Sequence, residues 1–97
     1  MIYHVATIAS WDVAKISGSY TATSLFTEGF IHCSTKLQVQ GVLQRYYQGQ
    51  THLVLLHIDE TLLNAELKYE NAPSVNQLFP HVFGAINVNA VVNVEKI

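Results

Sequence analysis

The chain has 97 residues, of which 49% are hydrophobic and 12% charged, a composition that predicts one domain spanning residues 1–97. Five Lys and Arg side chains are scattered along the chain against seven Asp and Glu, which argues against a nucleic-acid partner. A single cysteine excludes an internal disulfide, and no apolar run approaches the roughly 18 residues of a membrane span. We therefore expect a cytoplasmic protein that does not use a membrane.

The start of the chain predicts a strand followed by a short helix. Residues 2–8 alternate in polarity, with His4 on a mostly apolar face of the strand. Ser10 is suited to cap the helix, and Gly18 is placed to end it. The hydroxyl-rich segment 20–28 that follows is typical of a loop or a short extended segment.

The segment Gly29–Ser34 predicts a strand that leads directly into a helix. Successive strand side chains point to opposite faces, so His32 and Ser34 share one face while Ile31 and Cys33 share the other. His32 and Cys33 therefore lie across the sheet from each other and do not form a thiol and its base. The polar pair that this strand presents is His32 with Ser34.

A helix of about three turns is predicted next, from the three- and four-residue spacing of apolar side chains. Thr35 and Gln38 match a capping box at its start, and Gly49 marks its end. We expect Tyr46 and Tyr47 to belong to the core rather than to stack on a ligand. The segment 52–59 then has apolar residues on both faces, which predicts a central strand.

Two short elements are predicted in the next part of the chain. Leu62 and Leu63 indicate a single helical turn. Residues 67–70 indicate a strand with Leu67 and Tyr69 facing inward and Glu70 on the other face, followed by a loop.

His81 follows Pro80 in a segment that ends at Gly84, and we expect it in or near a turn. A strand is predicted over 91–97, after an alternating segment at 86–89 that can also turn. Taken together, the chain predicts an α+β domain of five or six short strands with two helices.

Each of the polar side chains also has a purely structural interpretation. His4 can be a core imidazole bonded to a backbone carbonyl, and His32 and Ser34 can cap the helix that follows them. Glu70 can be a solvated carboxylate at a strand end, and His81 can hold a loop in place.

Several kinds of site are excluded by their missing motifs. The chain has no dinucleotide-binding fingerprint, no phosphate-binding loop and no nucleophile elbow. No two histidines have the helical spacing of metal ligands, so the sequence predicts no metal site and names no cofactor.

Motifs along nearly the whole chain resemble a known family, the uncharacterised bacterial and plant family called domain of unknown function 952. The matching residues are Ile2-Tyr3-His4, Trp11 with Ala14, Leu25, Glu28-Gly29-Phe30-Ile31-His32-Cys33-Ser34, Leu55-Leu56, Tyr69-Glu70 and Phe79-Pro80-His81-Val82-Phe83-Gly84. That family is similar to the ADP-ribosyltransferase-type fold, to which tRNA 2′-phosphotransferases and NAD-consuming toxins belong.

The resemblance implies split antiparallel sheets around a cleft, with NAD as a substrate rather than a cofactor. His4 takes the position of a first-strand histidine that contacts the nicotinamide-side ribose, and Ser34 takes the position of a second-strand hydroxyl. Glu70 falls at the third-strand glutamate, with His81 near the cleft. The chain departs from the pattern because no arginine accompanies His4 or His32 to hold phosphates, and no clear tyrosine pair follows Ser34 to sandwich nicotinamide.

We therefore expect a cleft lined by His4, His32, Ser34, Glu70 and His81 that binds NAD, ADP-ribose or a related nucleotide. Glu70 and His81 are the expected catalytic residues, with Glu70 stabilising an oxocarbenium-like charge. The other three are expected to bind the ligand. The alternative is a non-catalytic domain, either a small-ligand-binding or a protein-interaction module, and we expect a monomer or a homodimer.

Overall fold

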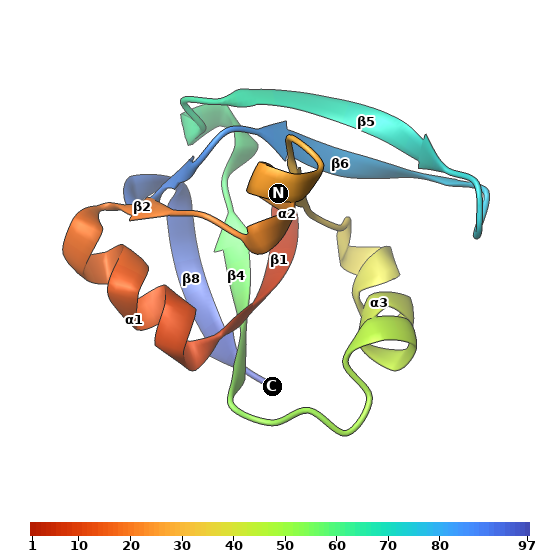
Figure 1. Ribbon diagram of the computed structural model, residues 1–97, viewed down its shortest axis with the longest axis horizontal. Helices are drawn as coiled ribbons and strands as arrows, with labels where there is room; N and C mark the ends of the chain where they lie inside the picture. Colours follow the sequence, from red (N-terminus) through yellow and green to blue (C-terminus); the bar gives the residue numbers. More distant parts are fainter.

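The computed structural model describes residues 1–97 and contains eight strands in three antiparallel sheets, together with three α-helices (Figure 1). The first sheet has the order β1-β4-β8, formed by β1 (Ile2–Thr7), β4 (Leu53–Ile58) and β8 (Val91–Lys96). The predicted α+β class and the central position of the 52–59 strand are both confirmed.

The second sheet has the order β3-β6-β5, formed by β3 (Ile31–His32), β6 (Gln77–Phe83) and β5 (Glu66–Ala72). Strands β2 (Ser19–Tyr20) and β7 (Ile86–Asn87) make a two-stranded third sheet. The hairpin of β5 and β6 runs across one end of the first sheet and extends past the third helix (Figure 1).

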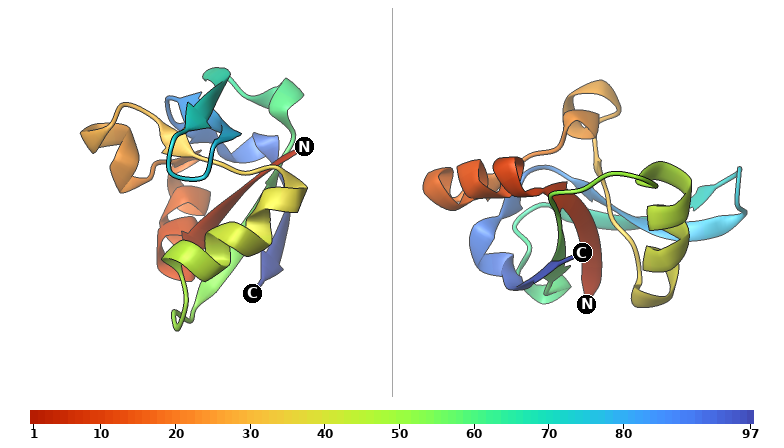
Figure 2. Two further views of the ribbon diagram at one scale, coloured as in Figure 1. Left: turned by 90° about the vertical axis from the view of Figure 1, so that its right-hand side faces the viewer. Right: turned by 90° about the horizontal axis from the view of Figure 1, so that it is seen from below.

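The helices are α1 (Ile8–Ser17), α2 (Thr23–Thr27) and α3 (Val39–Tyr46). Figures 1 and 2 show α1 and α3 on opposite sides of the first sheet. Short 3-10 turns lie at Lys36–Gln38, Glu60–Leu62 and Val88–Ala90. The turn at Glu60–Leu62 corresponds closely to the single helical turn predicted at Leu62 and Leu63. None of the helices has the length and apolar composition that a membrane-spanning segment requires.

Both faces of the first sheet are covered, which is why β4 is apolar on both sides. On the α1 side, Ile2 and Leu56 are fully buried together with Trp11. On the α3 side, Val5 and Leu55 belong to a smaller cluster that includes Val39 of α3. The two clusters pack β1 and β4 between α1 and α3.

The expected five or six strands and two helices were too few. The seven-residue strand β6 covers a segment that was expected to turn because of Pro80 and Gly84. The two-residue strand β2 and the helix α2 lie in or next to the segment predicted as a loop or short extended segment, and elements of this length contain too few residues to show a period of two or of 3.6.

The start of α1 also differs from the prediction. The cap is Thr7, whose Oγ1 accepts a hydrogen bond from the backbone N–H of Ser10 at 3.1 Å. Gly18 ends the helix as predicted, in the left-handed conformation with φ of +87°. The predicted cap residue therefore lies within the first turn instead.

The capping box predicted at Thr35 and Gln38 is confirmed. The Thr35 backbone N–H donates to Oε1 of Gln38 at 3.0 Å. The first turn is a 3-10 turn that continues into α3, and α3 ends at Tyr46 rather than at Gly49.

Two expectations in the second sheet were wrong. Tyr69 is 46% exposed rather than inward-facing, and its hydroxyl donates to Glu60 at 3.3 Å. His81 lies within β6 rather than in a turn. Pro80 lies in this strand as well, and its carbonyl accepts the N–H of Cys33 at 3.0 Å.

The segment from Ile31 to Ser34 joins the two three-stranded sheets. Ile31 and His32 pair with β6 of the second sheet. Two residues later, Ser34 exchanges two backbone hydrogen bonds with Tyr3 of β1, at 2.7 and 2.8 Å. This junction brings side chains from β1, β3 and β6 to one place.

Replacing Leu56 by Ala should destabilise the fold by about 2 to 5 kcal/mol, because this fully buried side chain lies at the centre of β4 and leaves a cavity. Leu37→Ala is the matched control, since Leu37 is 95% exposed and its truncation should change stability by less than about 0.5 kcal/mol. Urea unfolding of both variants measures the difference, and equal losses would contradict this description of the core.

Candidate functional site

A cleft of about 640 Å³ opens where β1, α3 and the β3-β6-β5 sheet meet. Four of the five residues proposed from the sequence line it: His4, His32, Ser34 and His81. The fifth, Glu70, does not line the cleft but bonds to His81. The structure therefore brings all five into one connected group.

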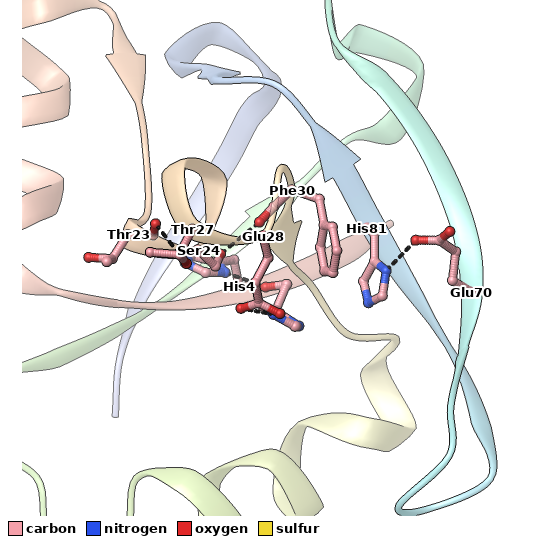
Figure 3. Close-up of polar contacts among 9 residues, drawn as sticks. His4, Thr23, Ser24, Thr27, Glu28, Phe30, Glu70 and His81 are labelled. Carbon is pink, nitrogen blue, oxygen red and sulfur yellow. Dashed lines mark hydrogen bonds and ion pairs between the residues drawn. The ribbon is translucent and has the colours of Figure 1, made fainter.

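His81 and Glu70 form a hydrogen-bonded pair between neighbouring strands (Figure 3). Nδ1 of His81 lies 2.7 Å from Oε1 of Glu70, and His81 is 7% exposed. An ionised carboxylate only accepts hydrogen bonds, so Nδ1 carries the proton and donates it. In the neutral imidazole, Nε2 then has a free lone pair and no partner within the protein.

Phe30 fixes the plane of the His81 ring. The two rings are stacked, with centroids 4.1 Å apart and planes 17° apart. The hydroxyl of Ser24 in α2 donates to the Phe30 carbonyl at 2.7 Å and anchors the turn that carries Phe30 (Figure 3). The imidazole is thus held by a bond at one edge and by packing on one face.

A second pair of histidine and glutamate lies beside the first. Nε2 of His32 is 3.1 Å from Oε2 of Glu28, and both side chains are about half exposed. The rings of His32 and His81 are 5.3 Å apart and nearly perpendicular. Glu28 also lines the cleft, and it was missed as a site residue because α2, which places it, was predicted to be a loop.

His4 uses both of its ring nitrogens inside the protein. Nδ1 donates to the backbone carbonyl of His32 at 2.6 Å, and Nε2 accepts from the hydroxyl of Tyr20 at 2.8 Å. Burial lowers the pKa of His4 from 6.5 to about 4 and raises that of Tyr20 to about 12, so both groups stay neutral near pH 7. His4 therefore holds the strand that carries His32. The sequence carried no signal for Tyr20, which lies on a two-residue strand.

Ser34 is 6% exposed, and its hydroxyl makes no hydrogen bond within the protein although its backbone is paired with Tyr3. No fully buried polar side-chain atom lacks a partner, so this hydroxyl must reach the open space of the cleft. Its neighbour Cys33 is 2% exposed, and burial raises the pKa of the thiol well above its usual range. The thiol is therefore protonated and poorly nucleophilic.

Two tyrosines lie on the α3 side of the cleft. Tyr46 is 61% exposed, which differs from the expectation that it belongs to the core, whereas Tyr47 is partly buried and packs against the smaller core cluster. Both line the cleft, as does Phe79 of β6. The site therefore combines three aromatic side chains with the polar group around His81.

Comparison with known proteins gave one family and close structural matches. The family model described as "Protein of unknown function (DUF952)" matches residues 5–94. The crystal structure of protein CC0527 from Caulobacter crescentus is 32% identical, with a TM-score of 0.87, and the match covers 96% of this chain and 82% of that one. The solution NMR structure of CC0527 is 31% identical with a TM-score of 0.84, covering 99% and 83%. The search of curated proteins found no match.

The lowered pKa of His4 predicts a specific loss of stability in acid. The unfolded chain takes up a proton at His4 near pH 6.5, whereas the folded chain does so only near pH 4. The His4 contribution to stability is complete above pH 6.5, and it should fall by up to about 1.4 kcal/mol per pH unit between these two values.

Urea unfolding at a series of pH values, for the wild type and for His4→Gln, measures this slope. The variant should lack the His4 part of the pH dependence, whereas His52→Gln, which changes an exposed histidine, should keep it. An identical slope in the wild type and in His4→Gln would contradict the assignment.

Proposed function

The chain belongs to the family described as "Protein of unknown function (DUF952)", and because that description assigns no activity we propose a function from the site itself. The cleft binds a small nucleotide-like ligand and exchanges a proton with it through His81. One observation carries the proposal: His81 is nine-tenths buried in the cleft wall, with Nδ1 held by Glu70 and Nε2 without a partner.

The pair of His81 and Glu70 has the arrangement that general-base catalysis needs. A carboxylate on one ring nitrogen sets the tautomer, orients the ring and stabilises the imidazolium that forms when the other nitrogen takes a proton. Stacking of Phe30 restricts the ring further. Glu70 is thus a positioning residue in this proposal, because its carboxylate lies behind His81 and does not line the cleft.

The relationship to the ADP-ribosyltransferase-type fold is part of this proposal. Its support is the placement of His4 on β1 and Ser34 just after β3, which both line a cleft between two antiparallel sheets, with Glu70 on β5 bonded to His81. NAD or ADP-ribose is then the ligand to test first. Ser34 and His32 would contact it, while His4 holds the backbone of His32.

With NAD, the proposed reaction is transfer of the ADP-ribosyl group. The bond between ribose C1′ and the nicotinamide nitrogen breaks, and nicotinamide leaves with the bonding electron pair. The oxygen of an acceptor hydroxyl or water bonds to C1′, and its proton passes to Nε2 of His81. The imidazolium is stabilised by the Glu70 carboxylate at 2.7 Å.

The alternative is a non-catalytic domain, a small-ligand-binding or protein-interaction module. The bond between His81 and Glu70 also ties β6 to β5, and this observation supports a purely structural role for the pair. Binding and turnover therefore have to be measured separately.

Titration of the labelled protein with NAD and with ADP-ribose, followed by amide and imidazole NMR, tests binding. We expect saturable shifts centred on His32, Ser34 and His81. We also expect His81→Gln and Glu70→Gln to lower any release of nicotinamide about a hundredfold or more, the usual contribution of an acid–base group.

Glu66→Gln is the control, because Glu66 lies on the same strand as Glu70 but is exposed and pairs with Lys68. Shifts without turnover would favour the non-catalytic binding module. An unchanged spectrum at millimolar ligand would contradict the proposal.

A further inference from the structure

The charged side chains around the cleft are carboxylates. Glu28 lines it, and Glu70 lies immediately behind His81. None of the residues that line the cleft is Lys or Arg. A nucleotide phosphate carries negative charge and is usually held by Arg, Lys or the amides of a helix start.

The cations of the chain are engaged elsewhere or lie outside the lining. Lys15 pairs with Asp12 on α1 at 3.2 Å. Lys68 on β5 is the register partner of His81, but it does not line the cleft, and its amine lies 3.6 Å from Glu66 and over the ring of Phe83. The guanidinium of Arg45 lies over the ring of Tyr46, 5.7 Å from its centroid, and does not line the cleft. The remaining cations are Lys36, Lys96 and the N-terminal ammonium, which pairs with Glu60, and all three are absent from the lining.

The histidines do not supply a net positive charge in their place. A proton on His32 is matched by the carboxylate of Glu28 at 3.1 Å, and a proton on His81 is matched by Glu70 at 2.7 Å. The third imidazole, His4, stays neutral because burial lowers its pKa to about 4. The side chains at the cleft therefore carry no net positive charge while the two carboxylates are ionised.

The helix start that follows Ser34 adds no free amide to the cleft lining, because neither Thr35 nor the turn at Lys36–Gln38 lines the cleft. The backbone N–H of Thr35, just after Ser34, donates to the side chain of Gln38 at 3.0 Å. This amide is therefore not available to an anion. Neither side chains nor this backbone group offer a phosphate site.

The cleft does offer partners for a sugar and a base. The Ser34 hydroxyl and Nε2 of His81 are two unpaired polar groups suited to ribose hydroxyls. Tyr46, Tyr47 and Phe79 provide aromatic surface on which a base can pack. These features suit the uncharged part of a nucleotide.

We propose that the cleft recognises the nucleoside part of its ligand and leaves any phosphate in solvent, so that its substrate class is ribonucleosides, with or without phosphate. This inference rests on the proposed function, because it concerns the same cleft. The proposed cleft differs in this respect from a site that holds a whole dinucleotide through its pyrophosphate.

Calorimetric titration with two pairs of compounds tests the inference: nicotinamide riboside with nicotinamide mononucleotide, and adenosine with adenosine monophosphate. The members of each pair differ by one phosphate. We expect at least one nucleoside to bind, with a dissociation constant within about threefold of its phosphorylated partner and little dependence on salt, since no opposing cation is present.

The substitution Asn71→Lys is a positive control for phosphate recognition, because Asn71 is an exposed residue of the cleft lining. One added cation should make the mononucleotide bind about tenfold tighter than the nucleoside. Asn93→Lys makes the same change on β8, outside the cleft lining, and should show no such preference.

Equal binding of nucleoside and mononucleotide to the wild type, with a preference only in Asn71→Lys, would support the inference. A wild-type preference for the phosphorylated compound as large as that of Asn71→Lys would overturn it and leave the proposed function intact. Failure of all four compounds, and of NAD and ADP-ribose, would overturn both.

Discussion

The backbone between Ile31 and Ser34 is hydrogen-bonded to both three-stranded sheets, and the candidate site depends on this junction. Its first half pairs with β6 and places His32 opposite His81, while Ser34 pairs with Tyr3 of β1. The buried imidazole of His4 adds a third restraint, because it donates to the His32 carbonyl at 2.6 Å. Because this short segment is bonded to both β6 and β1, it brings cleft residues from several elements together.

Two histidines that line the same cleft differ in what they can do. His4 has both nitrogens bonded within the protein and a pKa lowered by burial, so it is suited to hold structure. His81 has one nitrogen on Glu70 and the other free, so it is suited to exchange a proton with a ligand. Both residues are equally buried, so the two roles differ in how many ring nitrogens have a hydrogen-bond partner within the protein.

The sequence predicted what depends on local pattern. The alternation in 2–8 and 52–59 predicted β1 and β4, and four of the five proposed site residues line one cleft. It missed contacts between residues far apart in the chain and elements too short to show a period. Tyr20 meets His4 across 16 residues. Glu28 directly follows a helix of only five residues. Glu70 was identified, but its contact with His81 rather than with the cleft follows only from the register of β5 and β6.

The most direct test is the nitrogen-15 NMR spectrum of the imidazoles, recorded at alkaline pH with and without nicotinamide riboside. We expect His4 and His81 both to carry their proton on Nδ1. We also expect the ligand to shift Nε2 of His81 and to leave both nitrogens of His4 unchanged. A proton on Nε2 of His81, or a ligand-induced shift at His4 without one at His81, would contradict these assignments.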